Sequence, residues 1–381
     1  MRLYKTVVAG LTLASIVCWR AEAFETSARN AILMDFDTGE YLFEKNITEA
    51  VPPASMSKLM TVYILMSKIK DGSVKLDDVF SVSENAWRKG GAATGGSTMF
   101  LSIGDNVSVE NLIKGIVIQS GNDACIVVAE NISGSEEEFA ALMNKTAKDL
   151  GLKNSSFANS TGLPHPDQKM SMEDLAILSR HIIKEFPDLY HYFKEKEFTY
   201  NNIKQGNRNP LLYTMSGADG LKTGHTEEAG FCLAASATKD ERRLIEVMSG
   251  MNSNKERSEE SERLMSWGFR EFKNYNMFKK GQVVAQSKVW YGKDDTVELM
   301  VPHDVLKTIH IDQTDNVKAA AEFDEPIKAP IKAGDKLGVL RIEIEGQKPL
   351  EVSLVAAKNV EKVSLWGRFW ANIKFFLFGN K

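Results

Sequence analysis

Residues 51–60, VPPASMSKLM, place a basic side chain inside an apolar helical segment, and this limits how the chain can fold. Lys58 is flanked by the apolar residues Met56, Leu59, Met60, Val62 and Ile64. Burying an ammonium ion costs several kcal/mol unless the ion is paired or loses its proton. Lys58 therefore either reaches solvent along its aliphatic stem or is buried because the protein uses its amine.

Ser55 lies three residues before Lys58, so on a helix the two side chains share one face. A serine hydroxyl is a weak nucleophile until a base takes its proton. A lysine can be that base when burial and a second cation lower its pKa. The positive end of the helix dipole would also favour negative charge developing near Ser55. Taken alone, the pair is a weak signal, because it is common by chance and also fits a capping serine beside a solvent-reaching lysine.

Two further short motifs follow in the chain. They are Ser120-Gly121-Asn122 and Lys222-Thr223-Gly224. Each tripeptide is common, but S-x-x-K, S-x-N and K-T-G in this order form the active-site signature of penicillin-binding proteins and serine β-lactamases. The set therefore predicts acyl transfer through a serine nucleophile.

The N-terminus predicts export. Two basic residues precede an apolar run over 6–17, and Ala21 and Ala23 fit the −3 and −1 positions of a cleavage site. Residues 1–23 are therefore interpreted as a secretory signal peptide that is cut after Ala23. The alternatives are a membrane anchor, for which the run is short against a bilayer core of about 30 Å, and a lipid attachment site at Cys18.

Composition argues against several classes of function. A net charge of −4 gives no reason to expect a nucleic-acid partner. With 6 histidines, 3 cysteines and neither HExxH nor CxxC, we expect no metal and no cofactor. After cleavage only Cys125 and Cys232 remain, which is no disulfide framework and favours two free thiols over a pair. Cys125, just after Ser120, is interpreted as a buried packing residue.

Periodicity predicts the main elements. Residues 30–43 read as two strands joined by a turn, and 230–238 and 242–250 as further strands. Residues 109–118, 172–186 and 261–272 have helical character. The glycine-rich stretch 90–97 lacks the GK[ST] ending of a phosphate-binding loop and is interpreted as a mobile surface loop.

The character of the chain changes after about residue 277, where short alternating runs separated by Gly, Asp and Pro predict a small all-β module. In the last segment Leu365, Trp366, Phe369, Trp370, Ile373, Phe376 and Leu377 form one apolar helical face among basic residues. This pattern is typical of an interfacial helix on anionic lipid, and the alternative is a helix packed on the β module. The predicted divisions are 1–23, 24–277, 278–361 and 362–381.

In these motifs the chain resembles the low-molecular-mass penicillin-binding proteins of the D-alanyl-D-alanine carboxypeptidase type, which are serine peptidases of the S11 kind. The resemblance covers nearly the whole chain and includes PPASMSKLMT, SGNDAC, NSTGLPHPD and GLKTGHTEEAGFC. It implies an α/β (α+β) transpeptidase fold with a five-stranded sheet and a helical cluster. The site would lie between the sheet strand that carries Lys222 and the helical part that carries Ser55.

The resemblance also implies catalytic roles. Ser55 would attack the carbonyl between the two terminal D-alanines of a peptidoglycan pentapeptide stem, with Lys58 as general base. Ser120 and Asn122 would relay the leaving-group proton and hold the substrate amide. Lys222 would supply a second cation near Lys58.

Substrate binding is implied for four residues. Thr223 and Arg208 would receive the terminal carboxylate, although Arg208 fits a surface arginine nearly as well. Gly224 completes the motif, and the backbone N–H groups of the nucleophilic serine and of His225 would form the oxyanion hole. Family members often have histidine at the position of Thr161, which leaves no side-chain role there.

The resemblance places the protein in cell-wall biogenesis and cell shape, on the periplasmic face of the bacterial inner membrane as a peripheral protein. β-Lactam antibiotics would be covalent inhibitors. The rival enzymes are a serine β-lactamase and a DD-endopeptidase on the same fold. A class A lactamase would need a deacylating glutamate in E-x-x-L-N, which residues 160–175 lack. An inactive peptidoglycan-binding module is the rival from another class, and the intact motif set argues against it.

Overall fold

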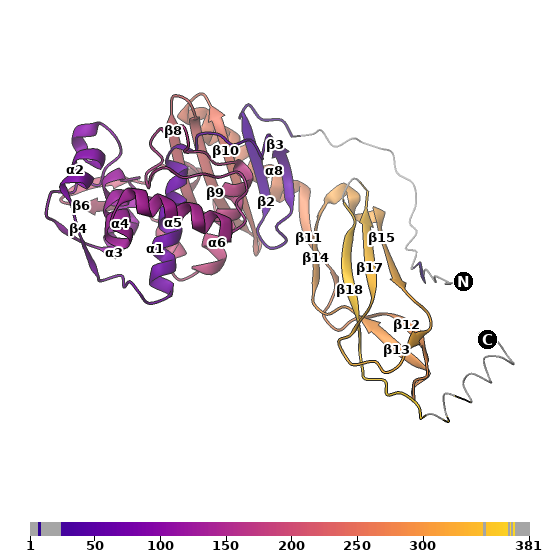
Figure 1. Ribbon diagram of the computed structural model, residues 1–381. Helices are drawn as coiled ribbons and strands as arrows, with labels where there is room; N and C mark the ends of the chain where they lie inside the picture. The colour runs from indigo at the N-terminus through magenta and orange to yellow at the C-terminus, as the bar shows by residue number, and fades with distance from the viewer. Residues whose placement is uncertain (1–6, 9–23, 346–347, 365, 367–368, 370–381) are drawn as a thin grey trace. The chain divides into compact units, whose positions relative to one another are not determined.

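The structure, a computed structural model, describes residues 7–8, 24–345, 348–364, 366 and 369 (Figure 1). The chain divides into two compact units, 23–270 and 271–381, the second including residues 1–22. The boundary expected after residue 277 falls inside strand β11 (Phe272–Phe278), which belongs wholly to the second unit. Apart from Val7–Val8, the predicted signal peptide lies outside the described residues, as does most of the predicted C-terminal helix.

A five-stranded antiparallel sheet forms the centre of the first unit (Figure 1). Its order is β3-β2-β10-β9-β8, with β2 at Asn30–Asp35, β3 at Tyr41–Lys45, β8 at Ala218–Thr226, β9 at Gly230–Lys239 and β10 at Arg242–Met251. The expected five-stranded sheet and its predicted strands are confirmed. Because both faces are covered, β2 is buried at every position rather than at alternate ones.

Helices cover both faces of this sheet. Ile32 and Val247 face the larger core, which contains the helical cluster, whereas Leu33 and Leu244 face helix α8 (Asn254–Glu271). The cluster comprises α1 (Lys58–Lys70), α2 (Glu84–Gly90), α3 (Val109–Val117), α4 (Asn122–Ser133), α5 (Glu136–Asp149) and α6 (Met172–Glu185). The short helix α7 (Leu211–Thr214) places Leu211 in the same core as Leu33 and α8. The predicted helices at 109–118, 172–186 and 261–272 are confirmed as α3, α6 and part of α8.

Short elements complete the first unit. They are the antiparallel pair β4 (Val79–Ser81) with β5 (Asn106–Ser108), the hairpin β6 (Glu197–Tyr200) with β7 (Ile203–Gly206), and the 3-10 turns η1 (Ala54–Ser57), η2 (Ala92–Thr94) and η3 (Tyr190–Lys194). Serine caps start several helices: the hydroxyls of Ser108, Ser135 and Ser171 accept backbone N–H groups of α3, α5 and α6.

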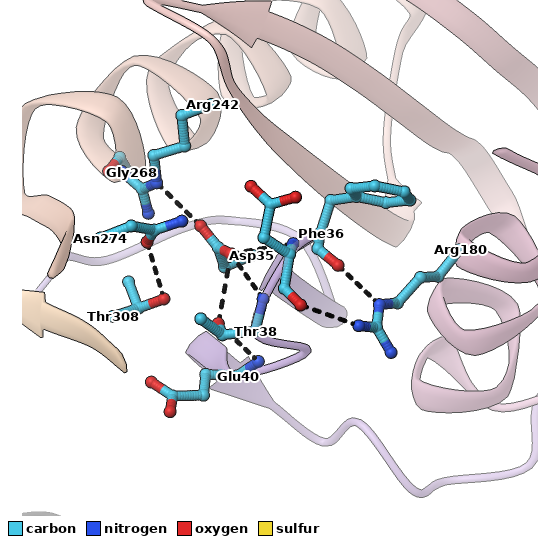
Figure 2. A network of polar contacts seen from close by, with 10 residues as sticks. Asp35, Phe36, Thr38, Glu40, Arg180, Arg242, Gly268, Asn274 and Thr308 are labelled. Atoms are coloured by element: carbon cyan, nitrogen blue, oxygen red, sulfur yellow. Dashed lines mark hydrogen bonds and ion pairs between the residues drawn. The ribbon is translucent and has the colours of Figure 1, made fainter. Parts of the chain in front are cut away.

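The turn between β2 and β3 is held by a buried carboxylate (Figure 2). Asp35 Oδ1 accepts the backbone N–H of Thr38 at 3.0 Å, and Asp35 Oδ2 accepts Nε of Arg242 at 2.8 Å. From α6, Arg180 Nε donates to the carbonyl of Phe36 at 2.6 Å. The turn is thereby tied both to β10 and to the helical cluster.

The second unit is built from strands and the 3-10 turn η4 (Ile311–Asn316). Its seven-stranded sheet has the order β1-β15-β17-β18-β13-β12-β16, and β11 pairs with β14. The bounds are β1 Val7–Val8, β12 Val283–Trp290, β13 Thr296–Met300, β14 Val305–His310, β15 Val317–Phe323, β16 Ile327–Lys328, β17 Lys336–Ile344 and β18 Leu350–Ala356. The predicted all-β module is confirmed, with Leu340, Ile342 and Leu354 in its core.

Two aromatic residues of the predicted C-terminal helix are described. Trp366 is 76% exposed and Phe369 is 55% exposed. Among the residues that the structure describes, none of the helices combines the length and apolar character needed to cross a bilayer.

Candidate active site

Ser55 lies in the 3-10 turn η1, and helix α1 begins only at Lys58. This refines the predicted helix around Ser55. Two prolines precede the turn, and Ala54 adopts φ +48°, a left-handed conformation that regular helix does not contain. In a 3-10 turn residues i and i+3 eclipse each other, which brings the Ser55 and Lys58 side chains together.

Lys58 is fully buried, so its side chain does not reach solvent. Its Nζ donates to Ser55 Oγ at 2.9 Å, to Asn122 Oδ1 at 2.8 Å and to the carbonyl of Thr161 at 2.5 Å. Burial is the main cause that lowers the pKa of Lys58 to about 8, and Arg208 lowers it further, while Cys125 and Asp123 oppose the shift. The amine is thus held beside the Ser55 hydroxyl, and its lowered pKa brings the neutral form within reach near neutral pH.

The second motif forms a tight corner between α3 and α4. Ser120 adopts φ +62°, an uncommon backbone conformation for serine, and its buried Oγ has no hydrogen-bond partner among the described residues. The N–H of Gly121 donates to the carbonyl of Gly115 at 2.9 Å, and that of Asn122 to the carbonyl of Ser97 at 2.8 Å. These bonds fix the corner so that Asn122 reaches Lys58.

The third motif lies on β8, the edge strand of the sheet. Lys222 is 3% exposed and its Nζ donates to the carbonyl of Thr223 at 3.1 Å. Burial, then the charges of Lys58 and Arg208, hold the pKa of Lys222 well below its usual range. A Cβ at Gly224 would lie 3.1 Å from the carbonyl oxygen of Pro53, so glycine lets β8 approach the turn that carries Ser55.

A pocket of about 660 Å³ joins the three motifs. Among the sequence-predicted residues, its lining includes Ser55, Ser120, Asn122, Arg208, Thr223, Gly224 and His225. Lys58 and Lys222 are buried next to it. The structure therefore brings every predicted site residue to one place, although they lie as far apart in the chain as Ser55 and His225.

Arg208 is placed at the wall of this pocket. Its Nη1 donates to Ser97 Oγ at 2.6 Å, and among the described residues it forms no ion pair with a carboxylate. The flanking Asn207 and Asn209 are buried, and Asn209 Nδ2 donates to the carbonyl of Gly220 at 2.6 Å. This frame leaves a guanidinium group without a counter-ion facing the pocket.

The glycine-rich stretch 90–97 is exposed over residues 92–96, as expected of a surface loop, but it is also part of the site. Gly95, Gly96 and Ser97 line the pocket. A Cβ at Gly96 would lie 3.0 Å from Asn122 Nδ2, so the small residues allow close approach to the second motif. The run of glycines was the only sequence signal that could have indicated this role, but such a run does not distinguish a pocket wall from a free surface loop.

Two contributions were not found from the sequence. The backbone carbonyl of Thr161, rather than its side chain, contacts Lys58. Arg257 on α8 is buried at the pocket, with Nη2 donating to Asn254 Oδ1 at 2.6 Å, and burial lowers the pKa of Arg257 to about 10. A carbonyl acceptor and a single helical arginine leave no recognisable sequence pattern.

His225 and the two cysteines were the remaining side chains to place. The His225 ring is exposed and lies 4.1 Å from the Phe231 ring between centroids. Cys125 and Cys232 are buried free thiols, as the cysteine count favoured. Burial raises the pKa of the Cys125 thiol to about 12, which excludes it as a thiolate nucleophile at neutral pH. The described residues hold no cluster of His, Cys, Asp or Glu suited to a metal ion.

The chain is similar to known proteins. Residues 18–253 match the family model described as D-alanyl-D-alanine carboxypeptidase, and residues 272–362 match the C-terminal domain of penicillin-binding protein 5. The chain is 41% identical to D-alanyl-D-alanine carboxypeptidase DacC of Escherichia coli K12, over 92% of this chain and 88% of that protein. It is 36% identical to DacA of Haemophilus influenzae, over 91% and 88%.

Solved structures are also similar to this chain. The crystal structure of penicillin binding protein 5 from Haemophilus influenzae superimposes with a TM-score of 0.82 at 36% identity, over 90% of this chain and all (100%) of that one. A point mutant of the Streptomyces K15 DD-transpeptidase matches with a TM-score of 0.60 at 25% identity, over 64% of this chain and 98% of that one.

Proposed function

The chain belongs to the D-alanyl-D-alanine carboxypeptidase family of serine peptidases (peptidase S11), and on this premise we propose that it removes the terminal D-alanine from peptidoglycan pentapeptide stems. The reaction passes through an acyl-enzyme on Ser55. One observation carries the proposal: the fully buried amine of Lys58 donates to the Ser55 hydroxyl at 2.9 Å, beside a pocket lined by the guanidinium group of Arg208, which has no carboxylate partner among the described residues.

Acylation begins when neutral Lys58 takes the Ser55 proton as Ser55 Oγ attacks the carbonyl between the two D-alanines. A positioned general base of this kind contributes about 10²–10⁴-fold in rate. Negative charge develops on the carbonyl oxygen, and the backbone N–H groups of Ser55 and His225 receive it. Both residues line the pocket, on η1 and at the end of β8 respectively.

The leaving D-alanine needs a proton on its amine. The buried, unpartnered hydroxyl of Ser120 is suited to pass the proton from Lys58, while Asn122 binds both Lys58 and the substrate amide. Water then hydrolyses the ester on Ser55 and returns the serine hydroxyl. This sequence balances protons without any group beyond the chain, its substrate and water.

The terminal carboxylate binds at Thr223 and Arg208. Arg208 has no carboxylate partner among the described residues, so a substrate carboxylate would supply its counter-ion. Lys222 lies next to Thr223 at this end of the pocket, and repulsion between its amine and that of Lys58 makes it costly for both amines to be charged at once. The same groups would bind the carboxylate of a β-lactam, which then acylates Ser55.

The proposal is tested by comparing D-alanine release with penicillin turnover on one preparation. We expect D-alanine release from a pentapeptide stem analogue and a covalent penicillin adduct by intact-mass measurement, both lost in Ser55→Ala. An adduct that persists in Ser55→Ala would sink the assignment. Rapid penicillin turnover without D-alanine release would favour the β-lactamase, and cleavage of cross-linked stems alone the endopeptidase.

The cellular setting is a separate proposal. Residues 1–23 direct export, and residues 362–381 attach the protein as a peripheral protein to the periplasmic face of the inner membrane. The high exposure of Trp366 and Phe369 and the neighbouring basic residues support an interfacial helix. Deleting 362–381 should release the protein into the soluble periplasmic fraction with its activity intact. Unchanged membrane retention would contradict the anchor.

A further inference from the structure

Asp123, the residue after Asn122, is a fully buried carboxylate that the mechanism above does not use. Its two oxygens accept hydrogen bonds from the segment 98–101. Thr98 Oγ1 donates at 2.5 Å, the Met99 N–H at 3.0 Å and the Leu101 N–H at 3.1 Å. Among the described residues no cation forms an ion pair with Asp123, so neutral donors alone solvate this carboxylate.

The segment 98–101 depends on these acceptors because it belongs to no helix or strand. Phe100 adopts φ +64°, an uncommon conformation for a bulky side chain. Buried backbone N–H groups need partners, and a helix or sheet ladder supplies none here. The carboxylate of Asp123 supplies the missing acceptors, and hydrogen bonds to a carboxylate are about twice as strong as those between neutral groups.

The same segment connects to the pocket through Ser97. The carbonyl of Ser97 accepts the N–H of Asn122 at 2.8 Å, and its Oγ accepts Nη1 of Arg208 at 2.6 Å. A Cβ at Gly90 would lie 2.3 Å from the backbone nitrogen of Asp123, so the start of α4 is tightly packed. Asp123 therefore links the S-x-N corner, the glycine-rich wall and the arginine that faces the pocket.

We propose that Asp123 is a positioning residue for the acyl-transfer reaction: its buried carboxylate fixes segment 98–101 and, through Ser97, holds Asn122 and Arg208 in their reactive places. The inference rests on the proposed function, because its effect is on acylation of Ser55. A displacement of about 1 Å in a catalytic group can lower a rate by about 10²-fold. Asp123 needs no contact with substrate to have such an effect.

Asp123 also has an electrostatic effect on Lys58. The charged or titratable groups that act on Lys58 are Asp123 and Cys125 from α4 and Arg208 from the loop before α7. Asp123 and Cys125 raise the pKa of Lys58, whereas Arg208 lowers it. The charge of Lys58 in turn lowers the pKa of Lys222 on β8. Removing the Asp123 charge should lower the pKa of the Lys58 amine.

The test compares Asp123→Asn with Asp174→Asn. Asp174 is a matched control: it is also buried and accepts the N–H groups of Lys153 and Asn154 at 3.1 and 2.7 Å, but the segment that it holds adjoins no residue of the pocket wall, whereas the segment held by Asp123 adjoins Ser97. Asparagine turns one acceptor oxygen of either residue into a donor. We expect Asp123→Asn to slow penicillin acylation about 10²-fold, mainly in the acylation rate constant rather than in binding, and Asp174→Asn to stay within about threefold.

The pH profile separates positioning from general loss of structure. In Asp123→Asn the midpoint of the rise in acylation rate should move to lower pH, whereas in Asp174→Asn it should match wild type. Equal acylation rates and equal midpoints in both variants would overturn the inference. Wild-type protein that forms no Ser55 adduct would instead refute the proposed function, so the two failures are distinguishable.

A milder variant covers the case in which Asp123→Asn does not fold. Thr98→Val removes the hydroxyl that donates to Asp123 and accepts the N–H of Phe100 at 3.0 Å, and it leaves the carboxylate in place. We expect a loss of about 3- to 10-fold in acylation from the loosened segment. An acylation rate unchanged in folded Thr98→Val would overturn the inference on its own.

Discussion

The two units of this molecule bury very different side chains. The first buries Lys58, Asp123, Lys222 and Arg257 at or beside the pocket. In the second, the described buried polar residues are Ser287, Lys307 and Thr308, and its core is otherwise aliphatic and aromatic. Burying charge costs free energy, and among the described residues of the second unit only Lys307 is a buried ionisable side chain. At the pocket of the first unit, the proposed chemistry uses the buried charge.

A second contrast lies inside the first unit. Asp35 and Glu246 are both fully buried carboxyl groups. Asp35 is satisfied by the turn that it holds and by Arg242 (Figure 2). Both oxygens of Glu246 on β10 lack a partner among the described residues, and burial raises the pKa of Glu246 well above its usual range. Glu246 is therefore a buried acid at the core, on no wall of the pocket.

The largest expected effect follows from removing the buried amine. Lys58→Met keeps an apolar stem of similar volume and removes the general base, so acylation should fall about 10²–10⁴-fold. Removing a buried charge in this way leaves stability unchanged or higher. Stopped-flow acylation by penicillin and thermal unfolding on the same samples measure both effects.

Lys58→Arg is the matched control, because it keeps the cation while guanidinium does not lose its proton. It should be as slow as Lys58→Met. In wild type the acylation rate should rise with pH and level off above about 8, the pKa of Lys58, since only the neutral amine takes a proton. A flat profile from about pH 6 to about pH 9 would contradict the role of Lys58.

A purely apolar deletion in the second unit should have the next largest effect. Leu340 on β17 is 2% exposed, and Leu340→Ala should destabilise that unit by about 2–5 kcal/mol. Acylation of Ser55 by penicillin at room temperature should stay at the wild-type rate, because no described residue of this unit lines the pocket. Calorimetry and acylation kinetics measure the two outcomes. A parallel loss of acylation would contradict the prediction that acylation does not depend on the second unit.

The smallest effect concerns Glu246. Below the unfolded-state pKa near 4.5 both folded and unfolded chains carry the proton. As pH rises towards the higher folded-state pKa, the unfolded chain loses its proton first, so wild-type stability falls. Glu246→Gln removes this slope, and its melting temperature should exceed that of wild type by about 3 °C at about pH 8 and match it at about pH 4. If the melting temperatures of wild type and Glu246→Gln changed with pH in the same way, the raised pKa of Glu246 would be contradicted.

Much of the fold could be predicted because its signals are local. The apolar run of β2 and the periodicity of α3 and α6 lie within single segments, and short alternating runs marked the second unit. The motif order indicated the chemistry in the same way, since the three motifs are short and each keeps its defining residue types. Local patterns need no knowledge of which distant segments meet.

Only the tertiary structure decided the surroundings of those motifs. The sequence by itself determined that Ser55 and Lys58 share a face, and that two further motifs follow in a set order. It did not determine that the Thr161 carbonyl would accept from Lys58, that residues 95–97 would form a pocket wall, or that Asp123 would hold segment 98–101. The burial that lowers the pKa of Lys58 is summed over many such distant contacts, and no single segment encodes it.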